Sequence, residues 1–300
     1  MTTPAPVAGK TQQLAPDLQC ILAPNPSPMT YWGTNTYILG RENIAIIDPG
    51  PDSDAHLNAI QNAIGSRKVS HIVVTHNHLD HSPLAQRLSK STGAPVFAFG
   101  THLDGRSEIM AELENGDPIG GGEGIDKAFA YDHQLQDGDN IKGDAWQLRV
   151  IHTPGHIGNH ICLAYGDIMF TGDHVMGWAS SLVSPPDGDL TDFMNSCEKL
   201  KQFDARIYYP GHGAPVKDPK ARLNWLITHR RQRESQILDA LRDAPKNKFD
   251  ITRKIYVDAP DGLMQAAERN VFAHLIDLHQ RGYVLAEPCL SQNAIFKLNN

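Results

Sequence analysis

Short apolar runs recur along the first two thirds of the chain and predict a series of β-strands. Runs of branched and aromatic residues that are bounded by glycine, proline or asparagine are typical of strands buried in a core. We expect strands at 31–39, 44–47, 69–75, 95–98, 146–152, 161–165, 168–171 and 205–209. The first two strands form a hairpin around the turn at 40–43.

Helical spacing appears between several of these strands. Leu57, Ile60 and Ile64 share one helical face, and Gly65 ends the pattern. Further helices are expected at 83–91 and 190–201. Residues 104–127 are rich in glycine and acidic residues without any period, so they predict a long loop, suited to a lid over a substrate. The glycines at 120–124 do not predict a phosphate-binding loop, because no strand or Gly-x-Gly-x-x-Gly frame precedes them.

The pattern changes at Pro219. A long helix is expected at 221–241, followed by helices at 251–256 and 263–281 and by a strand at 282–285 that begins a wing, as in a winged-helix bundle. Residues 1–218 carry 14 Lys/Arg and 25 Asp/Glu, whereas residues 219–300 carry 13 and 9, so the net charge changes from −11 to +4. We therefore predict two domains, at 1–218 and at 219–300.

Polar side chains follow four of the predicted strands at the points where these strands end. Each lies beside glycine or proline or in a loop, and residues at the ends of several strands meet at one edge of a layered sheet. They are, in chain order, His76, His78, Asp80, His81, His156, Asp173 and His212. This edge is the candidate functional site.

Histidine and aspartate at this density point to metal binding. Neutral imidazoles and carboxylates suit zinc or another divalent ion, and residues 76–81 contain more such groups than one tetrahedral site usually takes from a single loop. The loop therefore predicts two metal centres. Asp48, at another strand end, is either a residue that orients a metal-bound histidine or a turn residue.

The motif Thr-His-x-His-x-Asp-His at 75–81 resembles the signature of the metallo-beta-lactamase superfamily. Over residues 17–218, the resemblance implies an α/β fold in which two mixed sheets lie face to face with helices outside, the αββα sandwich. It also implies the metal ligands. His76, His78 and His156 would bind one divalent ion, Asp80, His81 and His212 the second, and Asp173 would bridge them. Zn²⁺ is the expected metal, with Mn²⁺ and Fe²⁺ as alternatives.

The stretches at 228–238 and 266–275, together with 33–37 and His160, resemble the beta-lactamase-like protein 2 branch of this superfamily. This resemblance spans nearly the whole chain. It implies a dinuclear hydrolase that uses a metal-bridging hydroxide and acts as an endoribonuclease on single-stranded RNA. Asp80 would also orient the hydroxide, and His160 and His174 are candidates for contacts with the substrate or the leaving group.

Other functions stay open, because the same dimetal edge serves carbonyl and phosphodiester substrates. The alternative is a thioester, ester or lactone hydrolase similar to glyoxalase II, favoured by the acidic first domain. A beta-lactamase is disfavoured because no secretion signal is visible, and a non-catalytic nucleic-acid-binding protein because all seven ligands are present. The basic tail either contacts RNA phosphates or forms a solvated surface on a packed helix. Its cations are Arg222, Arg230, Arg231, Arg233, Lys246, Lys248, Arg253 and Lys254.

Composition and the N-terminal sequence indicate the cellular compartment. The 300 residues are 40% apolar with a net charge of −7, and no stretch approaches the ~18 apolar residues that a membrane span needs. The start lacks a basic segment followed by an apolar run. We expect a cytoplasmic protein without a membrane partner, and the sequence indicates no oligomeric state. Cys20, Cys162, Cys197 and Cys289 are far apart and are expected to be buried in a reducing compartment.

Overall fold

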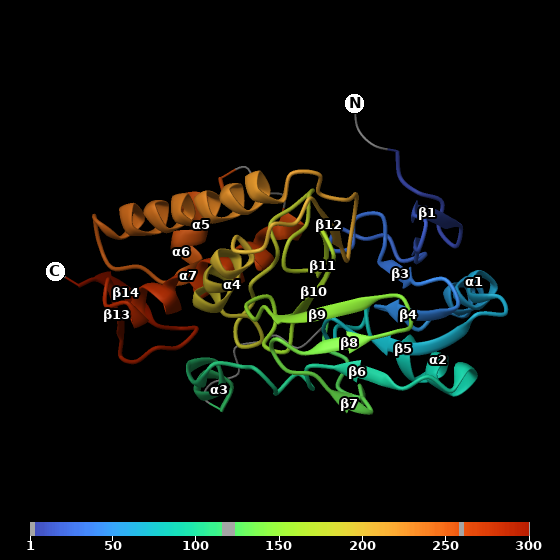
Figure 1. Cartoon of the computed structure of the whole chain (residues 1–300). Coiled ribbons are helices and arrows are strands. Elements are labelled where there is room, and N and C mark those ends of the chain that lie inside the picture. Colours follow the sequence, from blue (N-terminus) through green and yellow to red (C-terminus); the bar gives the residue numbers. More distant parts are fainter. Residues whose placement is uncertain (1–3, 116–123, 258–260, 300) are drawn as a thin grey trace.

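The computed structural model describes residues 4–115, 124–257 and 261–299 (Figure 1). Two β-sheets form the middle of the molecule in this view, with helices α1 and α2 at one end and the C-terminal helices at the other. Of the glycines at 120–124, for which the sequence does not favour a phosphate-binding loop, those at 120–122 lie outside the described residues and Gly124 lies within them.

The first sheet contains seven strands that follow one another in sequence order. They are β1 (Thr11–Ala15), β2 (Leu18–Leu22), β3 (Asn35–Leu39), β4 (Asn43–Ile47), β5 (Lys68–Val73), β6 (Val96–Ala98) and β7 (His133–Gln134). The pairs from β1 to β4 are antiparallel, and those from β4 to β7 are parallel. The crossovers contain α1 (Asp54–Ile64) and α2 (Leu84–Thr92).

The second sheet has the order β12-β11-β10-β9-β8. Its strands are β8 (Asn140–Lys142), β9 (Gln147–His152), β10 (Ile161–Tyr165), β11 (Ile168–Gly172) and β12 (Ile207–Pro210). The connection from β11 to its parallel neighbour β12 contains α4 (Leu190–Leu200), which Asp189 caps by accepting hydrogen bonds from Thr191 and Asp192.

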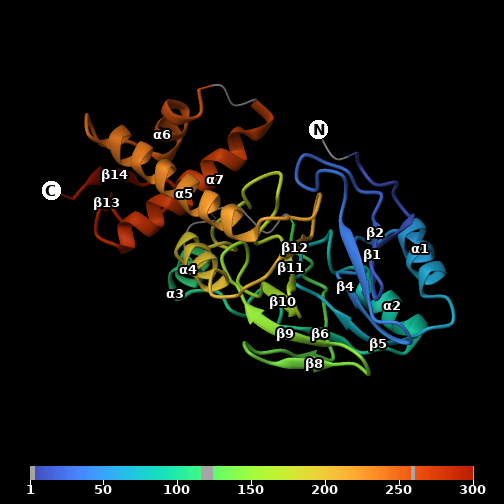
Figure 2. The ribbon, with the colours of Figure 1, turned by 45° about the horizontal axis from the view of Figure 1, so that its top comes forward.

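Three apolar clusters hold these layers together. Tyr37 and Val73 of the first sheet pack against Leu163 and Phe170 of the second. The other face of the first sheet packs on α1 and α2, and the other face of the second packs on α4 and the first half of the helix that follows β12. The order of layers is helix, sheet, sheet, helix, so the predicted αββα sandwich is confirmed (Figure 2).

The C-terminal part is a helical bundle with a two-stranded wing. It contains α5 (Pro219–Leu241), α6 (Lys248–Ile255), α7 (Asp261–Gln280), β13 (Val284–Glu287) and β14 (Ile295–Leu298). Leu226 of α5 packs with α4, whereas Ile237 packs with α6 and α7. Helix α5 thus belongs to both cores, and the domain boundary at Pro219 stays a prediction.

Several elements differ from the prediction. The strand expected at 31–39 begins only at Asn35, and the proline-rich start contains β1 and β2. The expected loop at 104–127 contains α3 (Glu108–Asn115), which is too short to show a period but buries Met110 and Leu113 against the C-terminal bundle. Cys289 is exposed, and the other three cysteines are buried as expected. Among the described helices, none is long and apolar enough to cross a membrane.

Candidate metal centre

The seven candidate ligands lie where strands of both sheets end. The loop after β5 carries the residues from His76 to His81, and the loop after β9 carries His156. Asp173 follows β11 and His212 follows β12. These ends meet, because the ligand atoms form two groups within which all atoms lie less than 4.8 Å apart. The members are His76, His78 and His156 in one group, and Asp80, His81, Asp173 and His212 in the other.

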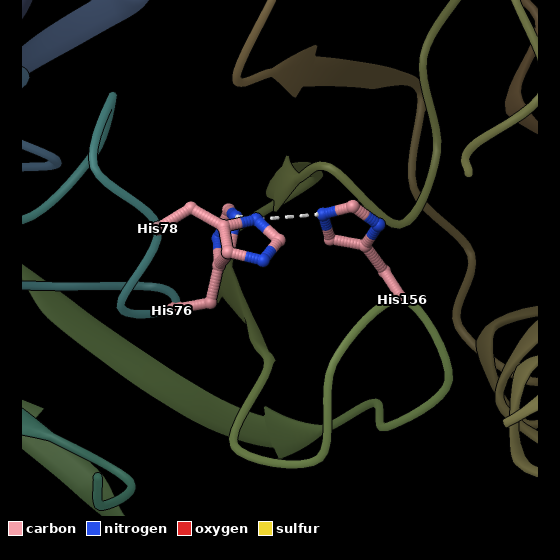
Figure 3. A group of neighbouring side chains, drawn as sticks. All are labelled: His76, His78 and His156. Atoms are coloured by element: carbon pink, nitrogen blue, oxygen red, sulfur yellow. Dashed lines mark hydrogen bonds between the residues drawn. The ribbon is translucent and has the colours of Figure 1, made fainter. Parts of the chain in front are cut away.

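The first group consists of three histidines whose rings converge from two loops (Figure 3). Nδ1 of His78 lies 3.1 Å from Nε2 of His76 and 3.0 Å from Nε2 of His156. Burial, together with the neighbouring His156, lowers the pKa of His78 to about 3, and burial also holds the pKa of His76 well below its usual value. Both rings are therefore neutral at pH 7, as a metal ligand requires.

The second group combines two histidines with two carboxylates. Nε2 of His212 lies 3.0 Å from Oδ2 of Asp80 and 3.2 Å from Oδ2 of Asp173. Burial lowers the pKa of His212, but Asp173 and Asp80 outweigh this effect and raise it to about 9. Burial raises the pKa of Asp173, but His212 and His81 outweigh it and hold that pKa well below its usual value. Burial also raises the pKa of Asp80, but the two histidines outweigh it and hold that pKa below its usual value, so both carboxylates are ionised.

Asp173, a member of the second group, also lies close to the first. Its Oδ2 is 3.2 Å from Nε2 of His212 in one group and 3.8 Å from Nε2 of His156 in the other. Its Oδ1 is buried without a hydrogen bond, at 3.5 Å from Nε2 of His81. A buried carboxylate oxygen without a hydrogen bond is costly unless another positive group binds it.

The hydrogen bonds around the histidines fit a divalent cation. Nδ1 of His156 faces the carbonyl of Leu182 at 2.7 Å, and Nδ1 of His212 faces the carbonyl of Gly33 at 3.1 Å. A carbonyl only accepts, so each ring carries a proton on Nδ1 and turns Nε2 toward the group. His212, whose pKa the two carboxylates raise, would release the proton on Nε2 when a cation binds there. Neutral nitrogen donors and carboxylates are the set that zinc and similar ions prefer.

Asp48 supports this arrangement from behind. Its carboxylate accepts hydrogen bonds from the backbone N–H and the hydroxyl of Thr75, at 2.7 and 2.8 Å, and lies 3.0 Å from Nδ1 of His81. Its φ of +50° places it in the left-handed region that few residues other than glycine adopt. This contact supports the hypothesis that Asp48 orients a histidine of the site.

His160 and His174 lie behind the two groups. Both are fully buried, and neither lines the cavity described below. Nε2 of His160 accepts a hydrogen bond from the backbone N–H of Asp173 at 3.2 Å, and Nδ1 faces the hydroxyl of Thr153. Their positions therefore give no support to the prediction that these histidines contact the substrate. Local sequence could not show this, because it does not reveal which side of a loop is buried.

A cavity of about 510 Å³ opens onto both groups. His78, Asp80, His156 and Asp173 lie in its wall. The other lining residues are Met29, Thr30, Gly124, Ile125, Met176, Leu182, Ser184, Asp187, Gln265, Ala266 and Arg269. The last three come from α7, so the C-terminal bundle forms part of this wall, which no local sequence signal indicated.

The arginines of α5 divide into inward and outward ones. Arg222 donates hydrogen bonds to the carbonyls of Met176 and Ala179, at 2.7 and 2.6 Å. The side chain of Arg230 is buried between α5, α7 and a loop of the first domain. The guanidinium groups of Arg222 and Arg230 thus already bind protein oxygens, which disfavours the alternative in which they bind phosphate. The side chain of Arg231, by contrast, is 69% exposed.

Two protein families match the chain, one over the sandwich and one over the C-terminal bundle. Residues 29–212 match the metallo-beta-lactamase superfamily, and residues 249–291 match the beta-lactamase associated winged helix domain. The chain therefore belongs to the metallo-beta-lactamase superfamily and is a hydrolase-type enzyme. The match over residues 249–291 confirms the winged-helix prediction.

Individual relatives narrow this placement. The chain is 30% identical over 277 residues to a protein of Drosophila melanogaster named beta-lactamase-like protein 2 homolog, which covers 87% of each chain. It is 29% identical over 235 residues to an atrochrysone carboxyl ACP thioesterase of Cryptosporiopsis, covering 77% of this chain and 64% of that protein. A beta-lactamase domain protein from Burkholderia ambifaria has the same fold, with a TM-score of 0.81, 21% identity and coverage of 98% and 94%.

Proposed function

We propose that this protein is a dinuclear, metal-dependent acyl hydrolase that cleaves a thioester or an ester. The observation that carries the proposal is the cavity, which joins both ligand groups to a largely apolar wall. Met29, Ile125, Met176, Leu182 and Ala266 line it. Ligand pockets of this kind bind apolar groups and fix their orientation with a few polar contacts.

The proposed ligand sets are His76, His78 and His156 for one ion, and Asp80, His81 and His212 for the other, with Asp173 shared. Divalent ions bound there supply Lewis-acid polarisation of a carbonyl oxygen and lower the pKa of water. Zn²⁺ suits this donor set, and Mn²⁺ or Fe²⁺ are alternatives. In this proposal Asp80, in the cavity wall, would orient the attacking water, and the apolar residues of the wall would shield the acyl group from bulk solvent.

Two further observations support an acyl substrate. One similar protein is named as a thioesterase, and the match covers 77% of the present chain and 64% of that protein. Among the described residues that line the cavity, Arg269 is the one lysine or arginine. A polyanionic strand would need more cationic contacts, because neutralised phosphates supply most of its binding free energy.

Single-stranded RNA is the second candidate substrate. The excess of basic residues in 219–300 and the exposed Arg231 of α5 favour it. Under this alternative, the outward cations of the C-terminal part bind the strand outside the cavity. RNA cleavage would then decrease steeply with salt, by about 0.7 log unit per tenfold salt for each neutralised phosphate.

The test is a parallel assay of zinc-loaded protein against acyl thioesters, carboxyl esters, lactones and single-stranded RNA. Asp173→Asn is the matched inactive variant, and Arg231→Ala is the matched surface variant. We expect thioester or ester turnover that Asp173→Asn abolishes and Arg231→Ala leaves unchanged. RNA cleavage that depends on Arg231 and on salt, without acyl hydrolysis, would assign the second substrate instead.

A further inference from the structure

The segment 181–183 connects the candidate metal centre to the C-terminal bundle. The carbonyl of Leu182 accepts a hydrogen bond from Nδ1 of His156 at 2.7 Å. The hydroxyl of Ser181 donates to the carbonyls of Asp173 and His174. One short segment thus contacts a ring of the first ligand group and the backbone of the residue that carries the Asp173 carboxylate.

Arg230 of α5 holds this segment from the other side. Its Nη2 donates a hydrogen bond to the carbonyl of Ser181, and its Nη1 donates to Oδ1 of Asn270 at 2.9 Å. The guanidinium also stacks 5.1 Å from the ring centre of Phe193. The residue is only 4% exposed. Two of its three nitrogens therefore bind neutral oxygens of groups that pack beside the site.

Asn270 of α7 completes the contact. Besides accepting from Arg230, its Oδ1 accepts from the backbone N–H of Val183 at 3.4 Å. Its Nδ2 donates to the carbonyl of Ala266, one turn earlier on α7. The amide is thereby fixed in one orientation, with its acceptor toward Val183 and Arg230. Arg230 and Asn270 thus bind both ends of the segment that contains Leu182.

The hydrogen bond between His156 and the carbonyl of Leu182 bears on metal affinity. A ligating histidine needs an acceptor for its second ring N–H, and loss of such a partner typically costs 10–100-fold in metal affinity. For His156 the acceptor is a backbone carbonyl, which moves with its segment. Burying a cation is also costly unless its hydrogen bonds are made, so Arg230 binds these oxygens in one defined geometry.

We propose that Arg230 and Asn270 are positioning residues: they hold 181–183 and thereby place His156 and Asp173 for metal binding. The inference rests on the proposed function, because it assumes that the ligand groups bind metal. It makes the winged-helix part a structural component of the metal centre.

The experiment measures zinc affinity by competition with a chromophoric chelator, which needs no substrate. Arg230→Met and Asn270→Leu remove the polar groups at similar size, Arg231→Met is the exposed neighbouring control, and Asn270→Asp retains the acceptor. We expect zinc binding 10–100-fold weaker for at least one of the two ions in Arg230→Met and Asn270→Leu. Arg231→Met should bind as the wild type does, and Asn270→Asp should recover most of the affinity. Circular dichroism of the metal-free proteins checks that each variant folds.

The outcomes separate the two proposals. If the wild type binds two zinc ions and the folded Arg230→Met and Asn270→Leu variants bind them equally well, the positioning role is wrong while the proposed function stands. If the wild type binds none of zinc, manganese and ferrous iron, the proposed function fails and the inference fails with it. If Arg230→Met does not fold, the difference in affinity between Asn270→Leu and Asn270→Asp decides, and equal affinities would overturn the inference.

Discussion

Replacing Asp48 by asparagine changes one side-chain oxygen into an amide nitrogen, and we expect this to weaken metal binding at the second ligand group. At present Oδ2 lies 3.0 Å from Nδ1 of His81, so the proton of that ring stays on Nδ1 and Nε2 faces the second ligand group. Asparagine tolerates the positive φ of this position and can keep the acceptor for the backbone N–H of Thr75. Its amide N–H₂ would then face His81, which must accept and carry its proton on Nε2 instead.

The magnitude follows from the role of such partners. A histidine with its proton on Nε2 offers no lone pair to a metal there, so affinity at the second group should decrease by about 10–100-fold, or about 1.4–2.7 kcal/mol. Zinc competition with a chelator measures this loss. The control is Asp52→Asn. Asp52 lies four residues after Asp48 and forms an exposed ion pair with Arg87, so its replacement should leave zinc affinity unchanged. Wild-type zinc affinity in folded Asp48→Asn would refute the reasoning.

Three further predictions use separate features. Asp80→Ala should leave the fold intact but decrease hydrolysis more than 100-fold, because it removes a proposed ligand at the cavity wall, and turnover near that of the wild type would contradict it. Gly211→Ala should lose zinc, measured by metal analysis, because its Cβ would lie 2.5 Å from Oδ1 of Asp173 and 2.6 Å from Cε1 of His81; retention of two ions would show that the loops can move apart. Burial lowers the pKa of His56 from 6.5 to about 4, so the folded protein binds this proton less readily than the unfolded chain does. The contribution of neutral His56 to the free energy of unfolding is therefore present above pH 6.5 and is lost as the pH falls through 4, a loss of about 3 kcal/mol. Chemical unfolding of wild type and His56→Gln at pH 7 and pH 4 measures this difference, and equal losses in both would exclude it.

The sequence predicted those parts of the site that depend on local pattern. The apolar runs before His76, His156 and Asp173 mark strand ends, and strand ends in a layered fold meet at one edge. The motif at 75–81 then indicated the family, and with it the layers and the ligand sets. Those signals lie within a few residues of one another, so they can be read without knowing the tertiary structure.

The remaining features depend on contacts between distant segments. Arg230 has the sequence surroundings of a solvated basic run, but Asn270 on another helix and the carbonyl of Ser181 draw it into the core. The acceptor for His156 is the backbone of Leu182, and a carbonyl group leaves no mark on residue type. Helix α3 has only two buried residues, Met110 and Leu113, too few to show a period.

The most direct test of the dinuclear acyl hydrolase is a zinc titration of the metal-free protein during hydrolysis of an acyl thioester. The ligands form two groups with Asp173 between them, so turnover should rise with added zinc and level off at two ions per chain. A plateau at one ion, or no turnover at any zinc concentration, would contradict the proposal.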